Sequence, residues 1–264
     1  MQSIFNDPTF HLRPKTIYDQ KLEWFGSDKK EIYDPRENPY GPNDIEYSFN
    51  KRGFRCDDFN QSSNIRIAFL GCSVTEAIGI KHTEGWAHRI LENIRRETNL
   101  DIPYWNLAMG GSGLDATIRA YHHYHDMLRP HIVFAFLPAY RREIFIPENS
   151  SNVPVFTNTF DDMLTKHEIL IDPRTIHYET EKNLAMLDLM LNKHDTMMIW
   201  NGWGYDHYPR DYHHRHNIII DWDRKGRDKM HPGSESHLRF ATKIYSQYRE
   251  KILSKIKSIG FGGP

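Results

Sequence analysis

The sequence predicts an α/β protein in which a doubly wound parallel sheet is covered by helices on both faces, in three α/β/α layers. Short apolar runs of strand length recur after residue 64. Most of them are apolar throughout, which is typical of parallel strands that are buried on both faces. Segments with helical spacing separate the runs, so strands and helices alternate in βαβ units with right-handed crossovers. The runs cover residues 65–70, 104–109, 132–137, 197–200 and 218–220.

The intervals between the runs supply the helices. Trp86, Ile90 and Ile94 recur four residues apart, which places them on one face of a helix. The same kind of spacing recurs over residues 118–128, 184–191 and 238–256. The sequence GFGGP ends the last of these helices. The interval 138–180 is longer than a crossover needs, so we expect an insertion near the edge of the sheet.

Residues 1–63 differ from the rest of the chain. They are rich in Pro, Asp, Asn and aromatic residues, and they show no sustained periodicity. A segment of this composition is expected to be irregular. We therefore predict an N-terminal extension over residues 1–63, packed on an α/β domain over residues 64–264.

Composition and charge exclude several classes of partner. The 264 residues include 34 Lys plus Arg and 35 Asp plus Glu, which gives a formal charge of −1 at pH 7. This balance provides no electrostatic reason to expect a nucleic acid or an anionic membrane as the main partner. No leader peptide is evident and no stretch approaches the ~20 apolar residues of a membrane helix. We therefore expect a cytoplasmic protein.

Neither the cysteines nor the histidines form a known metal motif. Cys56 and Cys72 are the two cysteines, too few for a disulfide scaffold and without the paired spacing of a structural zinc site. The 16 histidines include local clusters at residues 122–125 and 207–216. Neither cluster contains the carboxylate or cysteine complement of a known zinc motif. We expect no metal site and no organic cofactor.

A candidate nucleophile follows the first predicted strand. Doubly wound sheets bind ligands at the carboxyl ends of their strands, where Gly71 allows a sharp turn. Ser73 then lies at the start of the next helix, where backbone amides favour developing negative charge. Ser73 is therefore the candidate nucleophile, with a simple helix cap as the alternative. The thiol of the neighbouring Cys72 is a second alternative.

A candidate acid–base pair precedes the last predicted helix. Asp228 and His231 lie three residues apart on a tight turn, so they can face the same side. Asp228 can then hold one imidazole nitrogen while the other nitrogen faces a serine. A loop ion pair is the alternative interpretation of these two residues.

These two segments resemble the SGNH, or GDSL-like, hydrolase superfamily. Its first block is a G-D-S turn after the first strand, which Gly71-Cys72-Ser73 matches with Cys in place of Asp. Its last block is D-x-x-H before the final helix, which Asp228 and His231 match in full. The resemblance implies a serine hydrolase in which Ser73, His231 and Asp228 form the catalytic triad.

Two further segments strengthen the resemblance. Residues 106–113 follow the second run and resemble the family's N-x-G-x-x-G segment. Residues 50–55 are similar to an N-x-x-G-F-R lead-in found in a subset of these proteins. The resemblance spans about residues 47–257, and it implies a five-stranded sheet in the flavodoxin-like order 2-1-3-4-5.

The resemblance also implies which groups stabilise an oxyanion. Backbone amides of Ser73 and Gly111 are the first two donors. The family's third block, G-x-N-D, supplies an Asn donor after the third strand, but Tyr140 stands there in this chain. One missing donor commonly costs ~10²–10³ in rate. The phenol of Tyr140 or the guanidinium of Arg141 is the candidate replacement, because both groups donate hydrogen bonds.

The expected function is that of a serine esterase or acyl hydrolase acting on a small-molecule or glycan ester, with removal of O-acetyl groups from a carbohydrate as the specific expectation. The candidate substrate-binding residues are Arg141, Asn201 and Trp203. The alternative is a catalytically inactive binding or structural module with the same fold, such as a component of a virion or another assembled particle. The absent Asn and the long aromatic extension favour that alternative.

Overall fold

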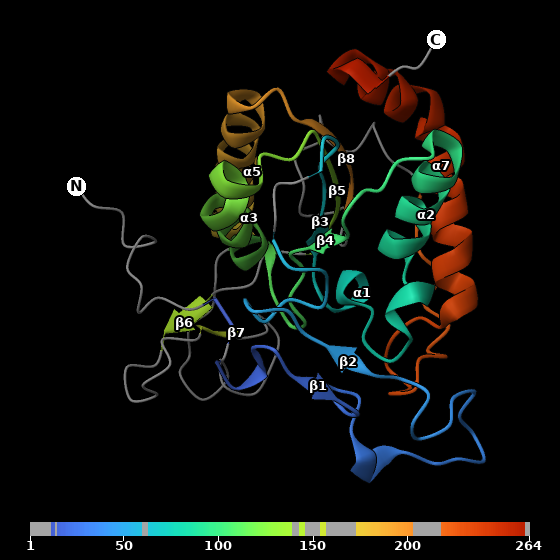
Figure 1. Ribbon diagram of the computed structural model, residues 1–264. Helices are drawn as coiled ribbons and strands as arrows, with labels where there is room; N and C mark the ends of the chain where they lie inside the picture. The colour runs from blue at the N-terminus through green and yellow to red at the C-terminus, as the bar shows by residue number, and fades with distance from the viewer. Residues whose placement is uncertain are drawn as a thin grey trace.

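The described part of the chain contains helices and strands arranged around a parallel sheet (Figure 1). The computed structural model describes residues 12–13, 15–59, 63–138, 143–145, 154–156, 173–202 and 218–261. Its strands are β1 (Lys21–Leu22), β2 (Tyr47–Ser48), β3 (Ile67–Gly71), β4 (Trp105–Asn106), β5 (Ile132–Leu137), β6 (Glu143–Phe145), β7 (Pro154–Phe156) and β8 (Met197–Gly202). Its α-helices are α1 (Ser73–Glu76), α2 (Trp86–Thr98), α3 (Leu114–Leu128), α5 (Pro173–Lys193) and α7 (Ser234–Ile256). Short 3-10 turns occupy Lys15–Ile17, Lys30–Ile32 and His82–Glu84, and a π-helical segment occupies Lys257–Phe261.

The main sheet is parallel and has the order β4-β3-β5-β8. Numbered along the chain, these are the second, first, third and fourth predicted strands, so the α/β class and this part of the predicted order are confirmed. β3 and β5 are buried along their whole length, as strands with helices on both faces should be. Gly71, Phe136 and Asn201 lie side by side across β3, β5 and β8, which brings their carboxyl ends to one edge.

The run at residues 218–220, predicted as a fifth strand, is not a strand in the structure. Ile218 and Ile220 are buried in the core beside α2 and α7, whereas Ile219 is 64% exposed. The apolar residues of this run therefore fill the core without strand pairing, and the parallel sheet of the described residues has four strands. Of the insertion expected over 138–180, the structure describes the antiparallel pair β6–β7 and the start of α5.

Two hydrophobic cores fill the space between the sheet and its helices. On one face α2 packs against α7, and on the other α3 packs against α5 (Figure 1). Phe69 and Phe134 stack on the α2/α7 face with ring centroids 5.4 Å apart. Trp86 of α2 meets Phe240 of α7 edge to face at 5.4 Å. Aromatic pairs of this geometry favour fixed packing, so the sheet is a rigid platform for its strand ends.

The helices follow the predicted apolar spacing. Trp86, Ile90 and Ile94 are all buried on the inner face of α2. α2 and α3 each end at a residue in the left-handed conformation, Asn99 and Arg129, whose backbone N–H groups close the last turn. None of the described helices combines the length and apolar composition needed to span a bilayer.

A third hydrophobic core joins the N-terminal segment to the chain just after α1. It contains residues from both parts, namely Ile17, Tyr40, Ile45, Tyr47, Phe49, Ala77, Ile78 and Ile80. Most of them are less than 5% exposed. Because α1 follows directly from β3, this core places the N-terminal segment beside the carboxyl end of the central strand.

Candidate active site

The turn that leaves β3 is built around a glycine. A Cβ at Gly71 would lie 2.2 Å from Thr75 Oγ1 and 2.9 Å from the carbonyl oxygen of Phe136. Both distances are far shorter than van der Waals contact, so a side chain here would displace α1 or β5. The missing side chain lets the chain pass directly from β3 into α1, whose first residue is Ser73.

A second turn, at residues 226–231, is closed by its own aspartate. Asp228 Oδ1 accepts hydrogen bonds from the backbone N–H groups of Met230, at 3.1 Å, and His231, at 3.0 Å. The backbone N–H of Gly226 donates to the carbonyl of His231 at 2.9 Å. Short-range bonds of this kind hold a turn in place without regular structure. They direct the second oxygen of Asp228 toward the His231 ring.

Ser73, His231 and Asp228 form one row of hydrogen bonds. Asp228 Oδ2 lies 2.5 Å from His231 Nδ1, and His231 Nε2 lies 2.6 Å from Ser73 Oγ. A carboxylate oxygen only accepts, so Nδ1 carries the ring proton and Nε2 accepts from the Ser73 hydroxyl. This is the arrangement by which serine hydrolases activate their nucleophile.

The surroundings of Asp228 fix its charge. The residue is 1% exposed, and burial alone would raise its pKa. The hydrogen bond and charge of His231, followed by the hydroxyl of Ser27, instead lower the pKa to about 2. Asp228 is therefore ionised at neutral pH, and it can stabilise a positive charge that develops on the imidazole.

The N-terminal segment adds a side chain to this row. Ser27 Oγ donates to Asp228 Oδ2 at 2.6 Å, the same oxygen that faces His231. Ser27 also lies 3.5 Å from His231 Nδ1. Sequence reasoning missed this residue, because it lies 201 positions before Asp228 in a segment without motif or periodicity.

Arg227 anchors the second turn in the N-terminal segment. It is 1% exposed, and its Nε lies 3.0 and 2.9 Å from the two carboxylate oxygens of Asp28. The guanidinium also donates to the carbonyl of Pro42 at 2.7 Å and to the carbonyl of Glu23. Its central carbon lies 3.9 Å from the centroid of the Trp24 ring. This buried cation is thus paired, hydrogen-bonded and stacked on one aromatic face.

The lead-in at residues 50–55 supports the first turn. Asn50 Oδ1 accepts a hydrogen bond from the backbone N–H of Phe54 at 3.1 Å, which shapes the lead-in. Arg55 is 3% exposed and donates to the carbonyls of Ala77, at 2.6 Å, and Ile80, at 3.1 Å. These carbonyls lie just after α1. The segment picked out by the family resemblance therefore braces the helix that carries Ser73.

Glu76 joins α1 to the loop after β4. It is 1% exposed, and its Oε2 accepts from the backbone N–H of Gly110 at 2.5 Å. Its Oε1 lies 2.5 Å from a guanidinium nitrogen of Arg13. Gly111 follows with φ at +79°, a conformation that favours glycine. The buried carboxylate thus holds the loop that carries Gly111 beside Ser73.

A cavity of about 450 Å³ opens over Ser73 and His231. Its wall is formed by Phe25, Gly26, Ser27, Cys72, Ser73, Ile78, Gly110, Gly111, Ser112, Pro138, Trp222, Met230 and His231. The volume falls within the range of small-molecule sites, ~300–1,000 Å³. Residues 25–27 come from the N-terminal segment, which therefore shapes the cavity as well as the hydrogen bonds behind it.

Of the other predicted site residues, the structure describes only Asn201. Tyr140, Arg141 and Trp203 lie outside the described residues. Asn201 is 1% exposed in β8, and it does not line the cavity. Within the described part of the chain its side-chain amide has no hydrogen-bond partner. The roles assigned to these four residues stay predictions.

The site thus brings a serine, a histidine and an aspartate together beyond the carboxyl end of β3 in a parallel sheet. No family model matches the chain, and no curated protein matches its sequence. Among solved structures the chain is similar to TesA, with 12% identity, a TM-score of 0.44, and coverage of 70% of this chain and 98% of that one. It is also similar to the psychrotrophic esterase EstA from Pseudoalteromonas sp., with 14% identity, a TM-score of 0.44, and coverage of 70% and 97%. The acetyl xylan esterase AlAXEase has 12% identity and a TM-score of 0.31, and the match covers 70% of this chain and 74% of that one. Esterases are thus among the solved structures to which this chain is similar.

Proposed function

We propose that this protein is a serine esterase in which Ser73 is the nucleophile, His231 the general base and Asp228 the residue that orients the base and stabilises its positive charge. One observation carries the proposal: the row of hydrogen bonds from Asp228 through His231 to Ser73 ends at the wall of a cavity of about 450 Å³. A buried ion pair alone would not require a serine hydroxyl at the open end of the row.

The proposed reaction proceeds in two halves. His231 Nε2 takes the proton of Ser73 Oγ as this oxygen attacks the ester carbonyl, and the backbone N–H groups of Ser73 and Gly111 donate to the oxyanion. His231 then gives the proton to the leaving alcohol. In the second half it activates a water molecule that releases the acyl group from Ser73. Tyr140 or Arg141 is the proposed third oxyanion donor.

The cavity wall supports a small acyl group on a ring-shaped alcohol, such as an O-acetylated sugar. Gly110 and Gly111 have no side chains, so they leave room close to Ser73 for an acetyl group. Phe25 and Trp222 offer aromatic surfaces on which the apolar face of a sugar can pack. We therefore propose deacetylation of a carbohydrate as the specific activity.

We also propose that the extension over residues 1–63 and the domain over residues 64–264 act as one functional unit. The hydrogen bond from Ser27 to Asp228 and the ion pair between Asp28 and Arg227 support this proposal. Both contacts lie directly behind the base, so a change in the extension is expected to alter catalysis.

A p-nitrophenyl phosphonate ester tests the proposed nucleophile. A serine activated by His231 attacks phosphorus and expels nitrophenolate, so we expect one nitrophenolate per chain and one phosphonyl adduct on the peptide that contains Ser73. Nitrophenolate absorbance and peptide mass spectrometry measure the two quantities. The Ser73→Ala variant should give neither. An adduct on Ser27 or Ser112, which line the same cavity, would contradict the assignment, and no reaction at all would favour the inactive binding module.

Ser27→Ala tests the contribution of the N-terminal segment. Hydrogen bonds to charged groups are worth ~1.5–3 kcal/mol, so we expect kcat for an ester substrate to fall about 10-fold or more, with KM little changed. The physical reason is that Asp228 Oδ2 loses a donor and holds the imidazole less firmly. Steady-state kinetics with p-nitrophenyl acetate measures the effect. Ser27→Thr keeps the hydroxyl and should retain most of the rate; an unchanged kcat in Ser27→Ala would refute the role.

A further inference from the structure

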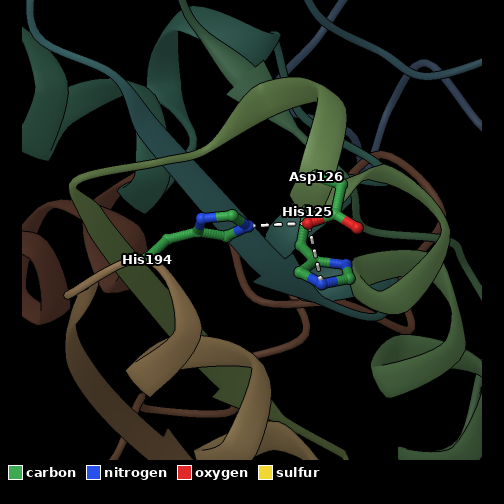
Figure 2. A group of neighbouring side chains, drawn as sticks. All are labelled: His125, Asp126 and His194. Carbon is green, nitrogen blue, oxygen red and sulfur yellow. Dashed lines mark hydrogen bonds and ion pairs between the residues drawn. The ribbon is translucent and has the colours of Figure 1, made fainter.

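A cluster of two histidines and an aspartate lies where α3 and α5 run side by side. His125 and Asp126 belong to the last turn of α3, and His194 follows the last residue of α5 (Figure 2). β5 and β8 begin shortly after these helix ends. The cluster therefore lies at the amino ends of the strands, whereas Ser73 follows the carboxyl end of β3.

We propose that His125, Asp126 and His194 bind a divalent transition-metal ion, with Zn²⁺ as the best fit, and that the ion links α3 to α5. Each residue offers one ligand atom, and these atoms all lie within 4.8 Å of one another. Two imidazoles and one carboxylate, with water in the fourth position, form a donor set that suits tetrahedral zinc. This inference is independent of the proposed esterase activity.

Two of the separations between the ligand atoms are close to those around a zinc ion. With bonds of ~2.0–2.1 Å and tetrahedral angles, neighbouring ligand atoms lie about 3.3 Å apart. His125 Nε2 lies 3.5 Å from Asp126 Oδ1, and His194 Nε2 lies 2.7 Å from the same oxygen. The first distance already fits. The second requires the half-exposed side chain of Asp126 to move by less than about 1 Å, which is within ordinary side-chain motion.

The orientation of His125 is the strongest single argument. Its Nδ1 lies 2.7 Å from the carbonyl oxygen of His122, which only accepts, so Nδ1 carries the hydrogen. In the neutral ring, Nε2 then presents a lone pair toward Asp126 Oδ1, and two acceptors face each other. A cation between them removes that repulsion. Metal-bound histidines are commonly oriented in this way, by a hydrogen bond from the other ring nitrogen to a backbone carbonyl.

The cluster has an open entry and one competing cation. The side chain of Asp126 is 56% exposed, whereas His125 is buried beneath it. Lys193 Nζ lies 2.7 and 2.8 Å from the two Asp126 oxygens. The side chain of Lys193 is itself 54% exposed and flexible, so a metal ion can displace its ammonium group at little cost. The sequence does not predict this site, because His194 lies 68 residues from Asp126 and the three ligands form no local motif.

Titration of the chain without an affinity tag with Zn²⁺, by isothermal calorimetry, tests the proposal. His194→Gln keeps a hydrogen-bond donor for Asp126 but removes the nitrogen lone pair, so we expect the affinity for one Zn²⁺ equivalent to fall about 10-fold or more. His177→Gln is the matched control, because His177 lies on α5 beside Glu181, away from the cluster. It should bind like the wild type. Equal affinity and stoichiometry in the wild type and His194→Gln, or no binding by the wild type, would overturn the site.

Two further measurements separate a metal site from a simple ion-pair cluster. Lys193→Met removes the competing ammonium, so we expect Zn²⁺ to bind about 2- to 5-fold more tightly, the value of an exposed ion pair. A weaker or unchanged affinity in this variant would contradict the geometry. Zn²⁺ should also raise the Tm of the wild type and leave the Tm of His194→Gln unchanged, because an ion that binds only the folded chain stabilises it.

Discussion

Replacing Ser73 with alanine is expected to lower kcat for p-nitrophenyl acetate hydrolysis by about 10⁴-fold or more. The variant lacks the oxygen that attacks the carbonyl, while the oxyanion donors and the cavity remain. His231→Ala is expected to cause a loss of similar size, because Nε2 is the acceptor 2.6 Å from Ser73 Oγ. Residues that act as one unit are not additive, so the double variant should be no slower than either single variant.

Stopped assays at matched protein concentration, corrected for hydrolysis in buffer, provide the measurement. Cys72→Ala is the matched control, because Cys72 is the neighbour of Ser73 and its thiol is the alternative nucleophile. It should retain most of the activity. Equal rates in the wild type and Ser73→Ala would exclude the esterase, and loss of activity in Cys72→Ala alone would transfer the role to the thiol.

Replacing Arg227 with methionine is expected to lower the free energy of unfolding by about 3–5 kcal/mol, the usual cost of breaking a buried ion pair. Methionine fills much of the space, but it leaves the carboxylate of Asp28 buried without its cation. The carbonyls of Glu23 and Pro42 lose a donor at the same time. Because the turn behind His231 loosens, we expect kcat to fall as well.

Urea unfolding followed by tryptophan fluorescence measures this loss. Arg36→Met is the matched control: Arg36 pairs with Asp34, but its side chain is 86% exposed, and exposed pairs contribute about 0–1 kcal/mol. The double variant Arg227→Met with Asp28→Leu should recover part of the stability, because it removes the unpaired charge. A loss in Arg227→Met no larger than that in Arg36→Met would show that the ion pair does not hold the turn.

The parts of the site that the sequence predicted are those with a local signal. Gly71 and Ser73 follow an apolar run, so their position at a strand end is evident from periodicity alone. Asp228 and His231 lie three residues apart, and a turn of that length fixes their relation. The strand order β4-β3-β5-β8 follows from the alternation of strands and helices together with the family resemblance.

The parts that the sequence did not predict depend on contacts between distant segments. Ser27 and Asp28 lie in an irregular stretch of the sequence. Their roles become evident only in the folded chain, where Ser27 contacts Asp228 and Asp28 contacts Arg227. The run at residues 218–220 shows the converse error. Its apolar residues predict a strand, but burial in the core produces the same pattern without strand pairing.

The contact between Ser27 and Asp228 also bears on when the proposed site forms during synthesis. Their separation of 201 residues, and that of 158 residues between Ser73 and His231, gives the site a high contact order. A ribosome releases the extension and the nucleophile before the base. A nascent chain that stops before residue 227 therefore contains Ser73 but not its base. Ser27 and Asp28 then lack their partners Asp228 and Arg227. The proposed activity thus requires synthesis to pass residue 231, because the turn at residues 226–231 closes the row.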